Sequence, residues 1–174
     1  METDEELYAQ LKSGDLAAFD VLYERHQRGL FSFIHGYLKS AEESEEVFHE
    51  AFMKMFNEKN ADFRDGSFKG WLYFIARNAA LNRIRSKKRA GIAHLHVAEA
   101  PATFELETEL VNQDVLAQLK TKAAELPIEL SEVLRMRLAG LSNQDVAQAL
   151  KIPVGTVKSR FHSLVQYLKT ELSL

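Results

Sequence analysis

The sequence of 174 residues contains no cysteine. This absence excludes a disulfide framework, a thiolate zinc site, an iron–sulfur cluster and a cysteine nucleophile. With only three prolines and eight glycines, the chain has neither a collagen-like nor a low-complexity composition. No apolar run approaches the about 18 residues of a membrane-spanning helix, and the acidic start does not resemble a secretory signal. We therefore expect a cytoplasmic protein without membrane insertion, built from one domain or two small ones.

Strand patterns are missing as well. Apolar residues recur at helical spacing almost everywhere, without period-two runs or hairpin signals, which predicts an all-α fold. Residues 90–104 lose this periodicity and contain Pro101, which indicates a flexible linker. The sequence thus predicts two small helical domains, over 1–89 and 105–174, joined by the linker 90–104, with the second beginning in a helix that ends near Leu126.

The near-neutral net charge of −3 hides a strong asymmetry along the chain. Residues 1–62 carry a net charge of −8, whereas residues 63–89 carry +7. Residues 90–127 carry −4 and residues 128–174 carry +2. A short block of +7 attracts polyanions whatever the total charge, and the acidic block suits a basic partner.

The basic block coincides with a predicted helix from about Ser67 to Arg89. One side of this helix is apolar, and the other presents amides and cations with Phe74 one turn earlier. Interleaved cations and aromatic rings suit single-stranded nucleic acid, because the backbone follows charge and the bases stack. By its spacing Trp71 is expected in the core, whereas Phe74 is expected to be exposed.

The segment 141–168 has the pattern of a helix-turn-helix. Ser142 to Asp145 form a capping-box pattern, with Asp in place of the usual Glu or Gln, and Pro153 forces a turn before the last helix. The start of that last helix exposes hydroxyls and cations. Such groups suit phosphates and guanine edges in a major groove.

Catalytic patterns are absent. His49-Glu50 begins like a zinc-protease HExxH, but Met53 stands where the second histidine is required. His94 and His96 lie in the predicted linker without neighbouring cysteine or carboxylate ligands, and neither a phosphate-binding glycine loop nor a nucleophile elbow occurs. We expect no enzymatic activity, no metal and no cofactor.

Residues 43–56, 63–89 and 126–168 closely resemble the extracytoplasmic-function (ECF) sigma factors of bacterial RNA polymerase. The resemblance implies sigma region two followed by sigma region four, with a flexible linker between them. It implies a promoter-specificity subunit that binds core RNA polymerase and promoter DNA, with region two melting the −10 element and region four recognising the −35 element. It also implies a possible anti-sigma partner. Without a heptad run, we expect a monomer when the protein is free.

The resemblance assigns roles to individual residues. The resemblance implies that the residues docking on polymerase are Glu45, Glu46, His49 and Glu50. It implies that the residues recognising the −10 element are Phe63, Arg64, Ser67, Phe68, Phe74, Arg77, Asn78, Asn82, Arg83 and Arg85. The residues that it implies for contacts to the −35 element are Thr156, Lys158, Ser159, Arg160 and His162. Three features depart from the family pattern: Asn82 replaces a frequent Asp, Phe56 replaces a frequent Trp, and the order of residues 64–67 differs. The promoter sequence therefore cannot be inherited from a relative.

Two alternatives remain open. Residues 141–161 are also similar to LuxR-like helix-turn-helix activators, although that interpretation leaves residues 63–78 unexplained. A nucleic-acid chaperone or RNA-binding protein would bind tightly without polymerase and depend little on Thr156 or Arg160. Co-elution with core polymerase distinguishes these classes.

Overall fold

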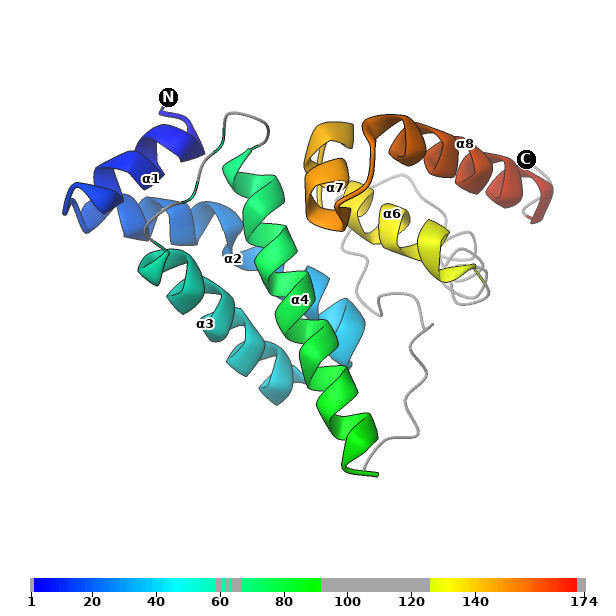
Figure 1. Cartoon of the computed structure of the whole chain (residues 1–174), viewed down its shortest axis with the longest axis horizontal. Coiled ribbons are helices and arrows are strands. Elements are labelled where there is room, and N and C mark those ends of the chain that lie inside the picture. The colour runs from blue at the N-terminus through cyan, green and yellow to red at the C-terminus, as the bar shows by residue number, and fades with distance from the viewer. Residues whose placement is uncertain (1, 59–60, 62, 64–66, 92–125, 172–174) are drawn as a thin grey trace, which may run out of the picture.

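A computed structural model describes residues 2–58, 61, 63, 67–91 and 126–171 of the chain. These residues form seven helices and no strand, which confirms the predicted all-α fold (Figure 1). The helices are α1 (Asp4–Lys12), α2 (Ala17–Leu38), α3 (Ala41–Asn57), α4 (Phe68–Arg89), α6 (Ile128–Leu138), α7 (Asn143–Leu150) and α8 (Val154–Glu171). None of the described helices is long and apolar enough to cross a membrane.

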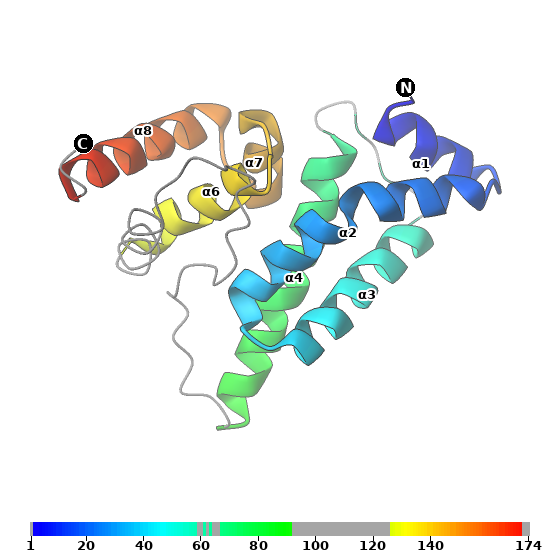
Figure 2. The ribbon, with the colours of Figure 1, turned by 180° about the vertical axis from the view of Figure 1, so that it is seen from behind.

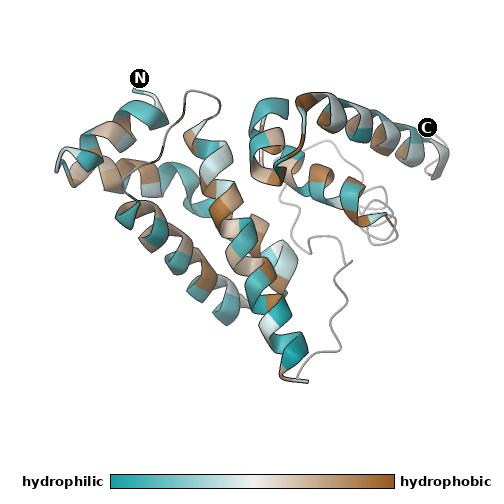
Figure 3. Ribbon diagram, in the orientation of Figure 1, coloured by the Kyte–Doolittle hydropathy of each residue, from teal (hydrophilic) through white to brown (hydrophobic). Residues whose placement is uncertain are grey.

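Helices α1 to α4 form the first module. Long helix α2 crosses α4, in front of it in Figure 2, and α3 packs against both. Their shared core contains the fully buried side chains of Leu22, Ile34, Val47, Met55 and Leu72. Hydrophobic positions on these helices alternate with hydrophilic ones in the manner expected for amphipathic helices (Figure 3). Helix α4 contributes buried side chains from Phe68 to Ile84, and its last turn is largely exposed.

The helix starts follow local capping signals. The Ser40 hydroxyl accepts a hydrogen bond from the Glu43 amide (3.4 Å) and caps α3. The Ser67 hydroxyl accepts one from the Gly70 amide (2.9 Å), so α4 begins where the sequence predicts. Helix α1 was not predicted. Its signal is a capping box in which Thr3 and Glu6 exchange backbone-to-side-chain bonds of 2.8 and 3.2 Å.

Helices α6, α7 and α8 form the second module. Gly140, with φ of +73°, ends the α6 region, and Ser142 starts α7 with the predicted Asp145 capping box. Lys151 adopts a left-handed conformation before Pro153, and α8 follows directly. Residues 92–125 lie outside the described residues, and with them most of the predicted linker, the helix expected to end near Leu126, and the histidines at 94 and 96.

The two modules pack directly against each other. Helix α7 lies along the first half of α4, and α6 approaches α2 (Figure 1). Buried side chains of the second module, among them Val133, Met136 and Val146, belong to the same apolar cluster as the core of the first. The sequence did not predict this contact, which decides how accessible α4 is.

Candidate nucleic-acid interface

The second half of α4 presents the basic ridge that the sequence predicted. Asn82, Arg85, Lys88 and Arg89 are exposed, and Asn78 is half-buried. The Arg85 guanidinium donates a hydrogen bond to the Asn82 side-chain oxygen (3.1 Å). This pairing places a cation beside an amide on an open helix surface, an arrangement suited to phosphates and base edges.

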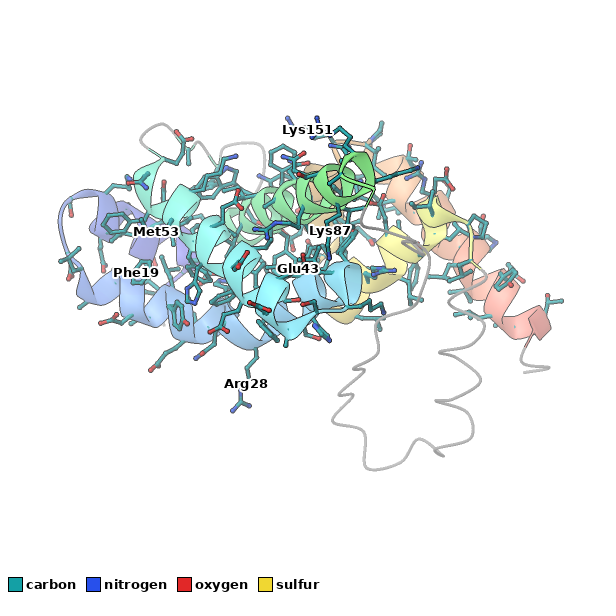
Figure 4. All side chains as sticks on the ribbon, turned by 90° about the horizontal axis from the view of Figure 1, so that it is seen from below. Phe19, Arg28, Glu43, Met53, Lys87 and Lys151 are labelled. Atoms are coloured by element: carbon teal, nitrogen blue, oxygen red, sulfur yellow. The ribbon has the colours of Figure 1, made fainter. Side chains whose placement is uncertain are left out.

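Two ion pairs join the basic ridge to α3. Arg83 contacts the Glu46 carboxylate at 2.6 Å. Lys87 contacts the Glu43 carboxylate at 2.7 Å, and both of these residues are labelled in Figure 4. The two pairs are partly exposed, so each contributes at most about 1 kcal/mol to stability. Their main effect is positional: Glu46, expected to dock polymerase, and Arg83, expected to contact DNA, hold each other at a common edge.

The predicted docking residues form one exposed stripe on α3. Glu45, Glu46, His49 and Glu50 are all exposed, and His49 lies 3.9 Å from the Glu45 carboxylate. The stripe continues into exposed apolar surface at Met53, 59% exposed (Figure 4), and at Phe56, 38% exposed. Sequence reasoning missed Met53 as part of this surface, although its spacing of four from His49 was the available signal.

The aromatic residues near the start of α4 correct one prediction. Phe68 was expected to contact DNA, but its side chain is completely buried. Its ring packs with Tyr8, Phe63 and Trp71, with centroid distances of 5.5 to 6.0 Å. A side chain in the first turn of a helix can face the core or the solvent. Here Phe68 faces the core because its ring packs against Tyr8 of α1. Trp71, expected in the core, is half-buried and packs against it in the same cluster, and Phe63 is half-buried at its edge.

The first half of α4 is covered by the second module. Phe74, expected to be exposed, is half-buried, with the Lys151 ammonium 4.4 Å from its ring centroid (Figure 4 shows Lys151 above α4). The Arg77 guanidinium donates hydrogen bonds of 2.8 and 2.5 Å to the Glu132 carboxylate. Arg64, the remaining charged residue predicted nearby, lies outside the described residues.

The start of α4 is tied to α7 by polar contacts. The Ser67 hydroxyl bonds to the Asp145 carboxylate, and the Ser67 amide donates to the Gln148 side-chain oxygen (2.9 Å). Lys69 donates to the Gly140 carbonyl (2.9 Å). Burial raises the pKa of Asp145, but hydrogen bonds from Ser67 and Ser142 outweigh it and leave the pKa below its usual value, so the carboxylate stays charged at neutral pH.

The helix-turn-helix presents its predicted side chains at the start of α8. Lys158, Ser159 and His162 are exposed, whereas Thr156 and Arg160 are half-buried. The Ser159 hydroxyl donates to the Thr156 carbonyl (3.0 Å). Beneath them Val157 and Leu164 are buried, so the amphipathic pattern of α8 is confirmed. Helix α7 packs against α8, so the polar face of α8 is held on a folded support.

Metal chemistry finds no support in the described part of the chain, where no group of three or more His, Asp or Glu side chains could hold an ion. The arrangement offers cations, amides, hydroxyls and an acidic stripe. These groups bind polyanions and proteins.

Family comparisons match both modules. Residues 22–90 match the family model of sigma-70 region 2, and residues 116–163 match that of sigma-70 region 4. The chain is 31% identical to the RNA polymerase sigma-H factor of Pseudomonas aeruginosa over 170 residues, covering 91% of this chain and 88% of that protein. It is also 31% identical to the ECF RNA polymerase sigma-E factor of Escherichia coli strain K12, with the same coverage of the two chains.

Solved structures share the fold. CnrH in complex with the cytosolic domain of CnrY matches with a TM-score of 0.69 at 20% identity, covering 99% of this chain and 98% of that one. The sigma factor RpoE of Bartonella quintana, in complex with the anti-sigma factor NepR, matches with a TM-score of 0.62 at 22% identity, covering 90% and 97%. The chain therefore belongs to the ECF family of RNA polymerase sigma factors, as an alternative sigma factor that directs promoter-specific transcription initiation.

Proposed function

We propose that the two modules divide promoter recognition between them, with docking on polymerase assigned to α3. The exposed stripe from Glu45 to Glu50, extended by Met53, binds core RNA polymerase. The ridge of α4 with Asn78, Asn82 and Arg85 holds the opened −10 strand, and Lys158 with its neighbours on α8 contacts the −35 duplex. The observation that carries this proposal is the acidic stripe lying directly beside the basic ridge.

The domain boundaries proposed for this division are 1–89, 90–104 and 105–174. Base extrusion at the −10 element costs a few kcal/mol of unstacking, which stacking and pocket contacts can offset. The half-buried ring of Phe63 supplies aromatic surface for such stacking. The protein acts in the cytoplasm, where its polymerase is, and catalyses nothing itself. It is a monomer when free, and an anti-sigma factor is a further partner.

Docking is tested by gel filtration with bacterial core RNA polymerase at moderate salt. We expect stoichiometric co-elution for the unmodified chain and its loss for the double variant Glu45→Lys, Glu50→Lys. Glu46 is left intact because its ion pair with Arg83 would mix loss of docking with loss of α3–α4 contact. The matched control is Asp20→Lys, Glu24→Lys, which introduces the same charge change at exposed positions of α2.

Failure of the unmodified chain to co-elute, while an authentic sigma factor binds the same polymerase, would overturn the proposed function. Equal binding by both double variants would remove only the docking assignment to α3. A fall in binding for the α2 control alone would move the docking surface to α2.

A further inference from the structure

Helix α1 is fixed on α2 and lies outside the region that matches the family model. The match to sigma-70 region 2 begins at residue 22, after α1 has ended. Leu7 and Leu11 of α1 are buried. The Asp4 carboxylate of α1 contacts Arg25 at 2.9 Å and His26 at 2.7 Å, both on α2. The proposed function does not use α1, yet its polar side chains reach both ends of the segment that joins α3 to α4.

At the end of α3, helix α1 supplies hydrogen-bond donors to carbonyls. The last carbonyls of a helix have no partner within that helix. The Tyr8 hydroxyl donates to the Glu58 carbonyl (2.9 Å) and lies 3.4 Å from the Met55 carbonyl. The Lys12 ammonium donates to the Phe56 carbonyl (2.9 Å), and its positive charge suits the negative end of the α3 dipole. Burial raises the pKa of Tyr8 to about 12, so its hydroxyl remains a donor at neutral pH.

At the start of α4, helix α1 supplies an acceptor. The first amides of a helix also lack partners within the helix. The Glu5 carboxylate accepts a hydrogen bond from the Phe68 amide (2.8 Å), in the first turn of α4. Its negative charge suits the positive end of the α4 dipole. Helix α1 therefore binds the end of α3 through donors and the start of α4 through an acceptor.

The ring of Tyr8 contacts an aromatic residue that lies between these two helices. Phe63 belongs to the joining segment, and its ring lies 5.5 Å from that of Tyr8 in an edge-to-face arrangement. It also lies 6.0 Å from the Phe68 ring and 5.6 Å from the Trp71 ring. Such pairs of rings favour particular geometries as well as burial. Since Phe63 is offered for stacking of a −10 base, its position depends in part on α1.

We propose that Glu5, Tyr8 and Lys12, which together form the α1 bridge, are positioning residues for recognition of the −10 strand. The α1 bridge holds the end of α3 and the start of α4 at a fixed separation, and it thereby sets the position of Phe63. It acts through Phe63 and the start of α4 rather than by its own contact with DNA. The contacts of the α1 bridge stand independently, whereas its role in reading the −10 strand rests on the proposed function.

The single tryptophan of the chain makes the α1 bridge measurable in the free protein. Trp71 is half-buried, and its ring lies 5.5 Å from that of Tyr8 and 5.6 Å from that of Phe63. A change in the packing of these rings therefore changes the exposure of the Trp71 indole. Quenching of its fluorescence by acrylamide measures that exposure on the full chain, without polymerase or DNA.

Two variants break the α1 bridge at its two ends. Tyr8→Phe deletes only the hydroxyl and keeps the ring against Phe63 and Trp71, and Glu5→Ala deletes the acceptor of the Phe68 amide. We expect the accessible fraction of Trp71 to rise by up to about fivefold in each, because the net contribution of one hydrogen bond corresponds to about that factor in an equilibrium constant. Glu5→Gln keeps a side-chain oxygen as acceptor and should restore most of the protection.

Two control variants separate the α1 bridge from a general loss of stability. Tyr23→Phe makes the same substitution at a half-buried tyrosine of α2, whose ring packs on α3. Ser40→Ala removes the cap at the other end of α3, so it lowers the stability of the same module away from the α1 bridge. Both variants should leave the quenching of Trp71 unchanged.

Reading of the −10 strand is tested with the same proteins bound to core RNA polymerase. The probe is a library of single-stranded DNA with randomised bases, from which the bound molecules are sequenced. We expect the unmodified chain to enrich one sequence, and Tyr8→Phe and Glu5→Ala to enrich it about fivefold less. Glu5→Gln and the two control variants should enrich it as the unmodified chain does. Every variant should still co-elute with polymerase, so that equal amounts of complex are compared.

Unchanged quenching of Trp71 in Tyr8→Phe and Glu5→Ala would overturn the α1 bridge. Increased quenching without a fall in enrichment would overturn its role in reading the −10 strand. An equal fall in enrichment for Ser40→Ala would overturn that role as well, because stability alone would then account for the loss. A failure of the proposed function would appear as no enriched sequence for the unmodified chain, a result that also removes the reading role but leaves the quenching of Trp71 unaffected.

Discussion

At the scale of single residues, we expect substitutions of exposed polar side chains on α4 and α8 to change how the protein binds DNA. Asn82 is exposed and accepts a hydrogen bond from Arg85, so its removal deletes an amide and frees a cation. We expect Asn82→Ala to slow open-complex formation several-fold while leaving duplex binding nearly unchanged. Permanganate reactivity of the melted strand measures the first and gel shift of the duplex the second. Ser86→Ala, at an exposed position one turn on, is the control, and equal loss in both assays would contradict the −10 role.

Lys158 is the exposed cation at the start of α8. If it contacts a phosphate, Lys158→Ala makes the plot of log affinity against log salt shallower by about 0.9, because one fewer counterion is released. Fluorescence anisotropy of the sigma–polymerase complex on a −35 duplex measures this slope. Lys169→Ala changes the same residue type at the other end of α8 and should leave the slope unchanged.

Asp4 makes the stability of the first module depend on pH. Its carboxylate lies 2.7 Å from His26 Nε2 and 2.9 Å from Arg25, and the hydrogen bond to His26, followed by that to Arg25, lowers its pKa despite burial. A carboxyl group whose pKa is lower in the folded state than in the unfolded state stabilises the fold at any pH above its unfolded pKa of about 4. This contribution to the free energy of unfolding is lost as the pH falls through the folded-state pKa. We expect Asp4→Asn to cost about 1 kcal/mol at neutral pH, and the cost to shrink below about pH 4.

Urea unfolding over a pH series measures this difference. The matched control is Asp20→Asn, which makes the same substitution at an exposed position of α2. A cost for Asp4→Asn that stays constant down to strongly acid pH would show that the charge of Asp4 contributes nothing.

At the scale of helices, the start of α7 is the point where a local cap and a long-range contact coincide. Ser142 accepts the Asp145 amide (3.1 Å) and donates its own amide to the Asp145 carboxylate (2.8 Å), while Asp145 also bonds to Ser67. We expect Ser142→Ala to lower the free energy of unfolding by about 1 kcal/mol. The midpoint of urea unfolding measures it. Ser163→Ala, exposed in the interior of α8, should act in the opposite direction because alanine favours helix.

Most of these helices were predictable because their signals are local. The caps at Ser67 and Ser142 are set by a few adjacent residues, and both were found where the sequence predicts them. Helix α1 carried an equally local capping box that sequence reasoning passed over. The burial of Phe68 was not predictable in the same way, because it depends on Tyr8, which is far from it in the sequence.

The candidate site was likewise predictable where its features depend on local sequence, and not where they depend on contacts between distant residues. Exposure of the α3 stripe, of Asn82 and Arg85, and of the start of α8 follows from helical periodicity. The covering of Ser67, Phe74 and Arg77 does not, because it requires knowing which surface of the second module meets α4. Glu132 and Arg135 are charged residues on the inner side of a helix, a pattern that indicates an interface. The sequence around them does not show which residues of the first module they contact.

At the scale of the whole molecule, helices α6 and α7 cover part of the α4 surface that is proposed to bind DNA. With donor and acceptor dyes on cysteines introduced at the exposed positions Glu24 and Gln166, we expect addition of core polymerase to lengthen the dye separation, and the concentration required to be about tenfold lower for Gly70→Ala. Titration of energy transfer against polymerase measures this midpoint. The Arg137→Ala protein, whose inter-module contacts are intact, serves as the reference, and an identical midpoint for all three proteins would show that polymerase binds without opening the chain.

Gly70 of α4 lies so close to α7 that an added Cβ atom would be 3.0 Å from the Asp145 Cα, and this close approach has an evolutionary consequence. Folding of the first module alone would favour alanine there, because alanine forms helix better than glycine. Glycine becomes advantageous when a helix of the second module needs the space beside it. In descendants of this chain we therefore expect glycine at this position where α7 still packs on α4, and alanine where it no longer does.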